Sequence, residues 1–250
     1  MAPIPKKVND RLVEGIKKFQ PIVAGQKAAD VGETDTVILV TELLAEVFGY
    51  DKFKEVTSEF SIKSTFCDLA TKIDDKLQTL IEVKAIGHEL KDNHVRQAVD
   101  YAANQGVEWV LLTNGQHWRA YHVECKGQIR QDLILQIDFL ALNQKEDDDL
   151  RLLFLLCKEG WAKSAIDDYQ TQREALNRFV VGATILSEKM LEKIRTELRR
   201  VSPDVRIEID DIRTVIENEV IKRELLEGEK AEAAKRTVAK AAKVALRETA

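Results

Sequence analysis

The sequence predicts an α/β sandwich with a mixed sheet, followed by a helical C-terminal extension. Three observations predict it. Apolar residues recur at helical spacing near the N-terminus, the period changes to two from about residue 55, and every pattern after about residue 146 is helical. A helical stretch also separates the third strand pattern from the fourth. Such a crossover lets these two strands lie parallel in an otherwise antiparallel sheet.

The first two elements are expected to be helices. The apolar positions within residues 7–29 indicate a helix that Pro21 interrupts, because proline lacks the amide hydrogen and crowds the preceding turn. A second helix is expected over residues 33–48, and Gly49 supplies its C-terminal stop. These helices lie before the strand region.

The strand region begins with a three-strand meander and continues past one helix. Strands are expected at 55–63, 64–73, 77–85, 107–113, 117–124 and 128–139, with a helix at 89–105. The run 74–76 is the turn signal between the second and third strands, and Asn114-Gly115 is a tight-turn signal after the fourth. The strand at 107–113 is apolar on both faces, as expected at the centre of a sheet.

The C-terminal part is expected to be wholly helical. Amphipathic stretches occupy 148–161, 165–186, 187–201, 208–226 and 229–250. The expected organisation is therefore an N-terminal segment, a core, a helical region and a tail, at 1–30, 31–142, 143–227 and 228–250. The tail is rich in Ala, Lys and Glu and is expected to be a solvated or partner-seeking helix, for which homo-oligomerisation and DNA contact both stay open.

Composition excludes several classes of protein. The chain has 250 residues, of which 44% are hydrophobic and 32% charged, which is typical of a globular protein with a sizeable core. Its three cysteines lie far apart, which excludes a zinc ribbon and a dense disulfide framework and favours a reducing, cytoplasmic setting. No apolar run is long enough to span a membrane, and no phosphate-binding loop predicts an ATP site.

The formal net charge of −5 limits how the protein could meet nucleic acid. A protein that binds nucleic acid by bulk charge alone is expected to be basic. Contact with DNA therefore requires a local basic face, or metal ions that offset the carboxylates.

Three charged residues are expected to converge on one face of the sheet. If the turn of the second hairpin centres on Asp75, the numbers of paired residues sum to 150, so Asp68 lies opposite Glu82. Glu82 and Lys84 are two apart on one strand and share that face. The alternative is an ordinary ion pair between exposed strands.

The strand around these three charged residues is apolar, so their side chains are expected to be partly withdrawn from water. Two carboxylates about 5 Å apart repel strongly where water is partly excluded, and a cation relieves the repulsion. Mg²⁺ typically takes one or two carboxylates together with waters and phosphate oxygens. A neighbouring lysine can position or activate water, or stabilise charge that develops on phosphate. The trio is thus suited to phosphodiester hydrolysis.

Further residues extend this pattern. Gln97 and Tyr101 are four apart, hence on one face of the expected helix 89–105. Together with Glu33, Asp68, the Glu-Val-Lys run at 82–84 and the motif Thr-Asn-Gly-x-x-Trp at 113–118, they resemble the PD-(D/E)XK nuclease superfamily. Within it, the N-terminal nuclease domain of type I restriction enzyme R subunits is the most similar, over about residues 30–125.

The resemblance implies a three-layer α/β/α, restriction-endonuclease-like core with a mixed sheet. It also implies Mg²⁺- or Mn²⁺-dependent endonuclease activity and DNA as substrate in restriction–modification. It implies that Asp68 and Glu82 are metal ligands and Lys84 the catalytic lysine. Gln97 and Tyr101 match an accessory motif near the site. Glu33 matches the acidic residue that the family carries on a helix. Glu59 is a neighbouring acid with a weaker match to the family pattern.

Two departures from the family pattern bear on function. Cys67 stands where the superfamily signature has proline before the aspartate. The motor domains of a type I R subunit have no counterpart in the chain. A free-standing nuclease, a truncated remnant and a module that works with a separate specificity or motor subunit all stay open. The alternative function is a non-catalytic nucleic-acid-binding or protein-adaptor module that retains the nuclease fold.

Overall fold

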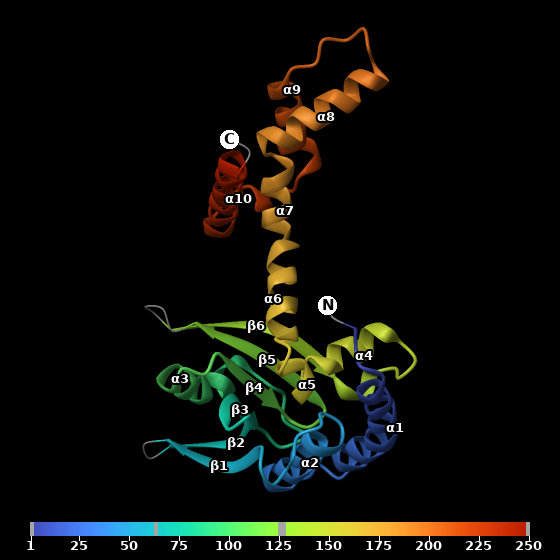
Figure 1. The fold of residues 1–250 in the computed structure, drawn as a ribbon, viewed down its shortest axis with the longest axis vertical. Coiled ribbons are helices and arrows are strands. Elements are labelled where there is room, and N and C mark those ends of the chain that lie inside the picture. The colour runs from blue at the N-terminus through green and yellow to red at the C-terminus, as the bar shows by residue number, and fades with distance from the viewer. Residues whose placement is uncertain (1–2, 63–64, 125–128, 249–250) are drawn as a thin grey trace. The chain divides into compact units, whose positions relative to one another are not determined.

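The computed structural model describes residues 3–62, 65–124 and 129–248, and the side chains of these residues except at 59–62, 65–66 and 244–248. Contacts divide the chain into two compact units, Met1–Asp168 and Tyr169–Ala250. The first unit contains the sheet and the helices around it, and the second is helical (Figure 1). The domain boundaries expected from sequence stay a prediction.

The first unit is built on a six-stranded sheet in the order β1-β2-β3-β4-β5-β6. Only the β3–β4 pair is parallel, so the sheet is mixed, as the sequence predicts. The strands are β1 (Val56–Ile62), β2 (Thr65–Ile73), β3 (Lys76–Val83), β4 (Trp109–Thr113), β5 (His117–Glu124) and β6 (Arg130–Asp138). The helices of this unit are α1 (Lys6–Ala28), α2 (Glu33–Glu46), α3 (Arg96–Gln105), α4 (Asp147–Phe154), α5 (Lys158–Trp161) and the start of α6 (Ala165–Ala175), with short 3₁₀ turns η1 (Asp92–Val95) and η2 (Phe139–Ala141).

Helices cover both faces of this sheet, which confirms the predicted α/β/α layering. On one face α3 packs over strand residues such as Ala70, Leu80 and Leu112 in a shared apolar core. On the other face the ring of Phe48, just after α2, meets Trp118 of β5 at 4.9 Å. Alternation along each strand therefore decides which layer a side chain contacts.

Helix α1 continues through Pro21, so the expected interruption there is wrong. Proline in a helix interior costs about 3 kcal/mol, which predicted the break. The helix nevertheless buries Leu12, Ile16, Phe19 and Val23 along one stripe on both sides of the proline. Apolar burial of about 1.5–3 kcal/mol for each such side chain outweighs the local penalty.

The β2–β3 turn differs from the expected one. Asp74 and Asp75 both have positive φ, 51° and 60°, and Ile73 pairs with Lys76, so the turn has two central residues and does not centre on Asp75. This geometry is the tight type of hairpin connection that matches strand twist. A register shift after Thr71 then restores the predicted sum of 150, as in the pair between Leu69 and Ile81.

Other element boundaries also depart from the expected ranges. The expected helix 89–105 is shorter, because residues before the 3₁₀ turn η1 are not helical and α3 begins only at Arg96. The expected stretch 148–161 divides into α4 and α5, and 165–186 divides at Asn177, whose side chain accepts a hydrogen bond from the Phe179 amide and caps the next helix.

The second unit has a small core of its own. Its elements are α7 (Arg178–Ile185), α8 (Glu188–Val201), α9 (Ile209–Val215), the π-helical turn η3 (Ile216–Val220), the 3₁₀ turn η4 (Arg223–Leu225) and α10 (Glu229–Glu248). Leu191, Ile212 and Ile216 are buried together. Helix α10 packs against α7 and buries Ala231 and Ala234, so the expectation of a solvated helix is wrong for its first turns.

No helix in the described part of the chain is both long enough and apolar enough to cross a membrane.

Candidate active site

The candidate site lies where β2 and β3 run side by side on the face covered by α3. The pairing of Leu69 with Ile81, continued by one residue, places Asp68 opposite Glu82. Ala70 and Leu80, next along the same face, belong to the core under α3. The two carboxylates thus stand at the border of an apolar layer, where water is partly excluded.

Asp68 is fixed by the backbone of the neighbouring strand. Its Oδ2 accepts a hydrogen bond of 2.7 Å from the Val83 amide. Burial raises the pKa of Asp68, the hydrogen bond from Val83 and the charge of Lys84 lower it, and Glu33 raises it, with a net shift upward. The carboxylate is therefore oriented, yet its charge is incompletely compensated.

The side chain of Glu82 is 13% exposed, which is less than the exposure of Lys84 or Glu33. Burial raises its pKa, and the charge of Asp68 raises it further, whereas Lys84 opposes both. The pKa values of both carboxyl groups are thus raised despite the nearby Lys84, which shows that one lysine does not fully compensate two negative charges.

Lys84 is the cation of the site and leaves the strand just after Val83. Its Nζ lies 2.7 Å from Glu82 Oε1 and 3.5 Å from Glu33 Oε2. Burial alone would lower the pKa of Lys84, but the hydrogen bond to Glu82 and the charges of Glu33 and Asp68 raise it. In this arrangement the ammonium group stays protonated at neutral pH and acts as a donor.

Glu33 is the first residue of α2, and half of its side chain is exposed. It joins the trio through Lys84, so the structure brings together four of the residues singled out in the sequence. The side chain of Glu59 lies outside the part of the chain that the structure describes.

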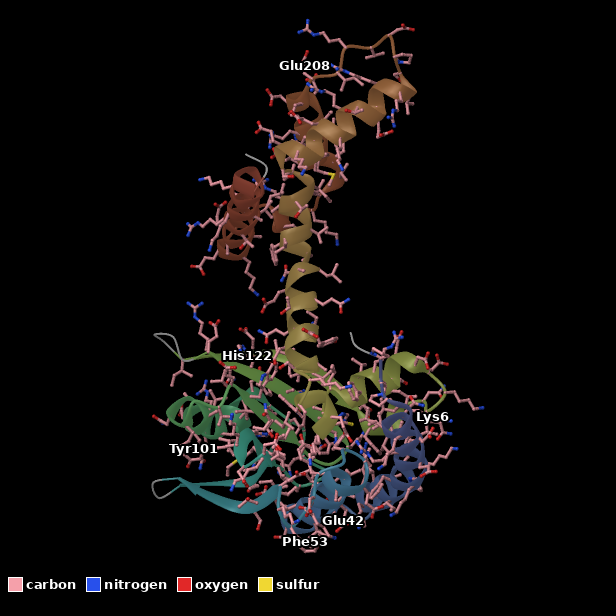
Figure 2. All side chains as sticks on the ribbon, viewed as in Figure 1. Lys6, Glu42, Phe53, Tyr101, His122 and Glu208 are labelled. Carbon is pink, nitrogen blue, oxygen red and sulfur yellow. The ribbon has the colours of Figure 1, made fainter. Side chains whose placement is uncertain are left out.

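Gln97 and Tyr101 form a pair of their own on α3, where Gln97 Nε2 donates a hydrogen bond of 3.1 Å to Tyr101 Oη. Tyr101 is only 7% exposed and belongs to the core under the helix, and Figure 2 shows it on α3. The structure thus unites the two residues, but none of its hydrogen bonds or ion pairs connects them to Asp68, Glu82 or Lys84 within the described residues.

Cys67 precedes Asp68 and is fully buried. Burial first, and then the charges of Glu82 and Asp68, raise its pKa to about 12. The thiol is therefore an inert neighbour of the acids and not a nucleophile at neutral pH.

Sequence reasoning missed Asn114, which holds the exit of β3 in place. Its Nδ2 donates to the carbonyls of Ile86, at 3.1 Å, and His88, at 3.0 Å, and its Oδ1 accepts from the His117 amide at 2.7 Å. The Lys84 amide in turn donates to the Thr113 carbonyl at 2.8 Å. The motif at 113–118 signalled a tight turn, but only the fold reveals that this turn anchors the loop after Lys84.

Thr36 of α2 anchors the same loop from the opposite side, because its Oγ1 accepts a hydrogen bond of 3.1 Å from the Ile86 amide. No local pattern in the sequence marks a contact between residues fifty positions apart.

The donor set fits a divalent cation of the Mg²⁺ type. Asp68 and Glu82 are oxygen ligands that already need positive charge, and Mg²⁺ uses one or two carboxylates with waters completing its shell. Among the described residues there is no group of three or more His, Cys, Asp or Glu side chains that could hold a metal ion.

The fold and this site define a mixed α/β/α domain with two acids and a lysine on one sheet face. Comparison with known families then gives a more specific finding: residues 39–135 match the family model described as Type I restriction enzyme R protein N terminus (HSDR_N). The match covers Asp68, Glu82, Lys84, Gln97 and Tyr101, and it confirms the resemblance for this segment. No curated protein and no solved structure matches the chain.

Proposed function

We propose that the α/β core is a metal-dependent DNA endonuclease of the restriction-enzyme type. One observation carries the proposal above all: two partly buried carboxylates, Asp68 and Glu82, share a sheet face with a lysine whose Nζ is 2.7 Å from one of them. The matched family of type I restriction enzyme R proteins supports DNA as the substrate.

Asp68 and Glu82 would hold Mg²⁺ or Mn²⁺, which supplies Lewis-acid polarisation of the scissile phosphate. Asp68 is prepared for this role because the Val83 amide already fixes one of its oxygens. Glu82 is prepared because its burial and its acidic neighbour leave it in need of a cation.

Lys84 would act as a protonated donor. Held by Glu82 and Glu33, its ammonium group can orient the attacking water and stabilise the charge that develops on phosphate oxygens in the transition state. Because its neighbours raise its pKa, Lys84 suits this role better than that of a general base.

Gln97 and Tyr101 would assist from α3. Tyr101 Oη accepts the hydrogen bond from Gln97, so its own hydroxyl hydrogen can be donated to a substrate phosphate. Glu33 would hold Lys84 in position from α2.

Cleavage of supercoiled and linear DNA tests this proposal. We expect wild type to cut in Mg²⁺ or Mn²⁺, and Lys84→Ala to lose at least about 10²-fold in rate, as removal of a transition-state donor does. Lys76→Ala is the matched control, because Lys76 is an exposed lysine of β3, the strand that precedes Lys84. Equal cutting by wild type and Lys84→Ala would contradict the assigned site.

A non-catalytic nucleic-acid-binding or protein-adaptor module is the second candidate. The observation that favours it is the formal net charge of −5, because an acidic chain does not offer a DNA substrate the bulk positive charge that usually attracts it. Binding of DNA without metal-dependent cutting by wild type would support the adaptor. A separate specificity or motor subunit as partner stays a prediction for either function.

A further inference from the structure

Arg119 lies on the same face of the sheet as the proposed active site. Glu82 of β3 pairs with Leu112 of β4, and Leu112 pairs with Arg119 of β5. Residues paired across neighbouring strands share a face, so Arg119 is in line with Glu82. Two strand spacings place their Cα atoms about 10 Å apart.

The guanidinium group of Arg119 is largely withdrawn from water. Its side chain is 21% exposed, and its Nε is buried without a hydrogen-bond partner among the described residues. A buried charged group is costly unless it is paired and hydrogen-bonded. Burial raises the pKa of Tyr121 and a hydrogen bond with Arg119 opposes that rise, so the guanidinium has a polar neighbour besides Asp92. Its Nε nevertheless has no acceptor among the described residues.

Asp92 pairs poorly with this guanidinium group. Its Oδ1 lies 3.8 Å from Arg119 Nη1, which is beyond hydrogen-bond distance, and its side chain is 73% exposed. The same oxygen accepts a hydrogen bond of 2.9 Å from the Tyr121 hydroxyl. A structural Arg–Asp ion pair is frequently bidentate, with two parallel hydrogen bonds, and Arg119 and Asp92 do not form such a pair.

Phosphate is the ligand that this arrangement suits. The planar guanidinium matches a phosphate group with two parallel hydrogen bonds, and DNA offers a phosphate at every nucleotide. A side chain about 10 Å from the cleavage site would meet a phosphate other than the one that is cut.

We propose that Arg119 binds a non-scissile phosphate of the DNA strand held at Asp68, Glu82 and Lys84, and that Asp92 is the exposed counterion which this phosphate displaces. This inference rests on the proposed nuclease function and deepens it. Arg119 positions the substrate and does not take part in bond breaking. A cation next to the site would also allow a protein with a net charge of −5 to contact DNA.

Binding of a short fluorescein-labelled DNA duplex, followed by anisotropy over a range of salt concentrations in Mg²⁺, tests the proposal. All variants carry Lys84→Ala so that the duplex stays intact. We expect Arg119→Gln to bind about tenfold more weakly and to reduce the slope of log affinity against log salt by about 0.9, the value for one phosphate contact. Arg119→Lys should keep the slope, because it keeps the charge.

Two further variants separate binding from a structural role. Arg130→Gln removes an exposed arginine of β6 that alternation places on the opposite sheet face, and it should leave affinity and slope unchanged. Asp92→Asn removes the competing carboxylate and should raise affinity about threefold, in line with the loss of one exposed charge pair. If Arg119 and Asp92 formed only a structural pair, both variants would lower the thermal midpoint and neither would raise affinity.

In a Lys84-containing background, Arg119→Gln should raise KM for DNA and leave kcat nearly unchanged. If wild type cuts DNA but Arg119→Gln keeps the affinity, slope and KM, this inference is wrong and the nuclease function stands. If wild type binds DNA through Arg119 but never cuts, the arginine site stands and the nuclease function is wrong. No binding of DNA by wild type would overturn both.

Discussion

At the scale of single residues, the site keeps two partly buried carboxylates close together, and their ionisation lowers the free energy of unfolding. Burial raises the pKa of Asp68 and of Glu82, so ionising them in the folded protein costs free energy. Because their folded pKa values lie above those of the unfolded chain, the folded state binds more protons in the window between the two. This penalty is absent below the ordinary carboxyl pKa and is present in full above the raised values.

Asp68→Asn should therefore stabilise the metal-free protein at neutral pH while abolishing DNA cleavage. The amide can still accept the Val83 hydrogen bond, and the repulsion with Glu82 is removed. A gain on the order of 1 kcal/mol would raise the thermal midpoint by about 2–4 °C. Calorimetric scans in a chelator measure it, and the difference should shrink as the pH falls below the ordinary carboxyl pKa.

The control for this prediction is Asp100→Asn, which changes an exposed aspartate of α3. It should leave the midpoint nearly unchanged at every pH. A lower midpoint for Asp68→Asn at neutral pH would show that Asp68 is a structural ion-pair residue and would count against an uncompensated acidic pair.

At the scale of elements, the turn after β4 supports the loop that carries the lysine. Asn114 is 2% exposed and makes three hydrogen bonds to the backbone of Ile86, His88 and His117. Its removal leaves buried polar groups without partners. The loop after β3 would then lose its fixed position relative to the sheet.

Asn114→Ala should accordingly lower the free energy of unfolding by about 2–3 kcal/mol, as measured by urea denaturation, and should reduce the rate of DNA cleavage. Asn104→Ala is the matched control, because Asn104 is exposed on α3 and donates to the carbonyl of Asp100 alone. Equal effects of the two substitutions would contradict the anchoring role of Asn114.

The register of the β2–β3 hairpin illustrates how far sequence reasoning reaches. Alternation and the turn signal correctly predicted that pair numbers near the site sum to 150. In the structure the two-residue turn pairs Ile73 with Lys76, whose numbers sum to 149. An irregularity then leaves an extra residue, Gln78, on β3, and this raises the sum to 150 for the pairs closer to the site. The prediction of facing acids was thus correct, although the turn behind it was wrong.

Other features could not be predicted from local pattern because they depend on contacts between distant parts of the chain. The continuity of α1 through Pro21 depends on apolar burial against neighbouring elements. The position of Arg119 beside the site depends on the order of strands in the sheet, which joins β3, β4 and β5. Glu33, by contrast, was found from the family pattern and lies 3.5 Å from Lys84 Nζ.

At the scale of the whole molecule, the chain consists of two units with separate cores. The site residues all lie in unit 1, Met1–Asp168, and the Trp109 indole of this unit donates a hydrogen bond of 3.1 Å to Asp167 at its end. Unit 2 contains the α7–α10 contact and the small core around Leu191.

A fragment of residues 1–176, which retains α6, should therefore fold with a cooperative melting transition and keep the DNA-cutting activity of the full chain. Scanning calorimetry and the plasmid assay measure these two properties. An unfolded fragment would show that the C-terminal residues are needed for the core.

The predicted homo-oligomer is tested separately by deleting residues 228–250 and comparing mass in solution by light scattering. A lower mass than that of the full chain would support assembly through the C-terminal helices. An unchanged mass would contradict it.

Calorimetric titration of the protein with Mn²⁺ determines whether the acidic pair beneath α3 is the metal centre of a nuclease. We expect saturable binding by wild type, loss of that binding in Asp68→Ala, and unchanged binding in Asp100→Ala. The affinity should also weaken as the pH falls through the raised carboxyl pKa values, because protons compete with the metal. The absence of saturable binding by wild type, or equal binding by wild type and Asp68→Ala, would contradict this assignment of the metal centre.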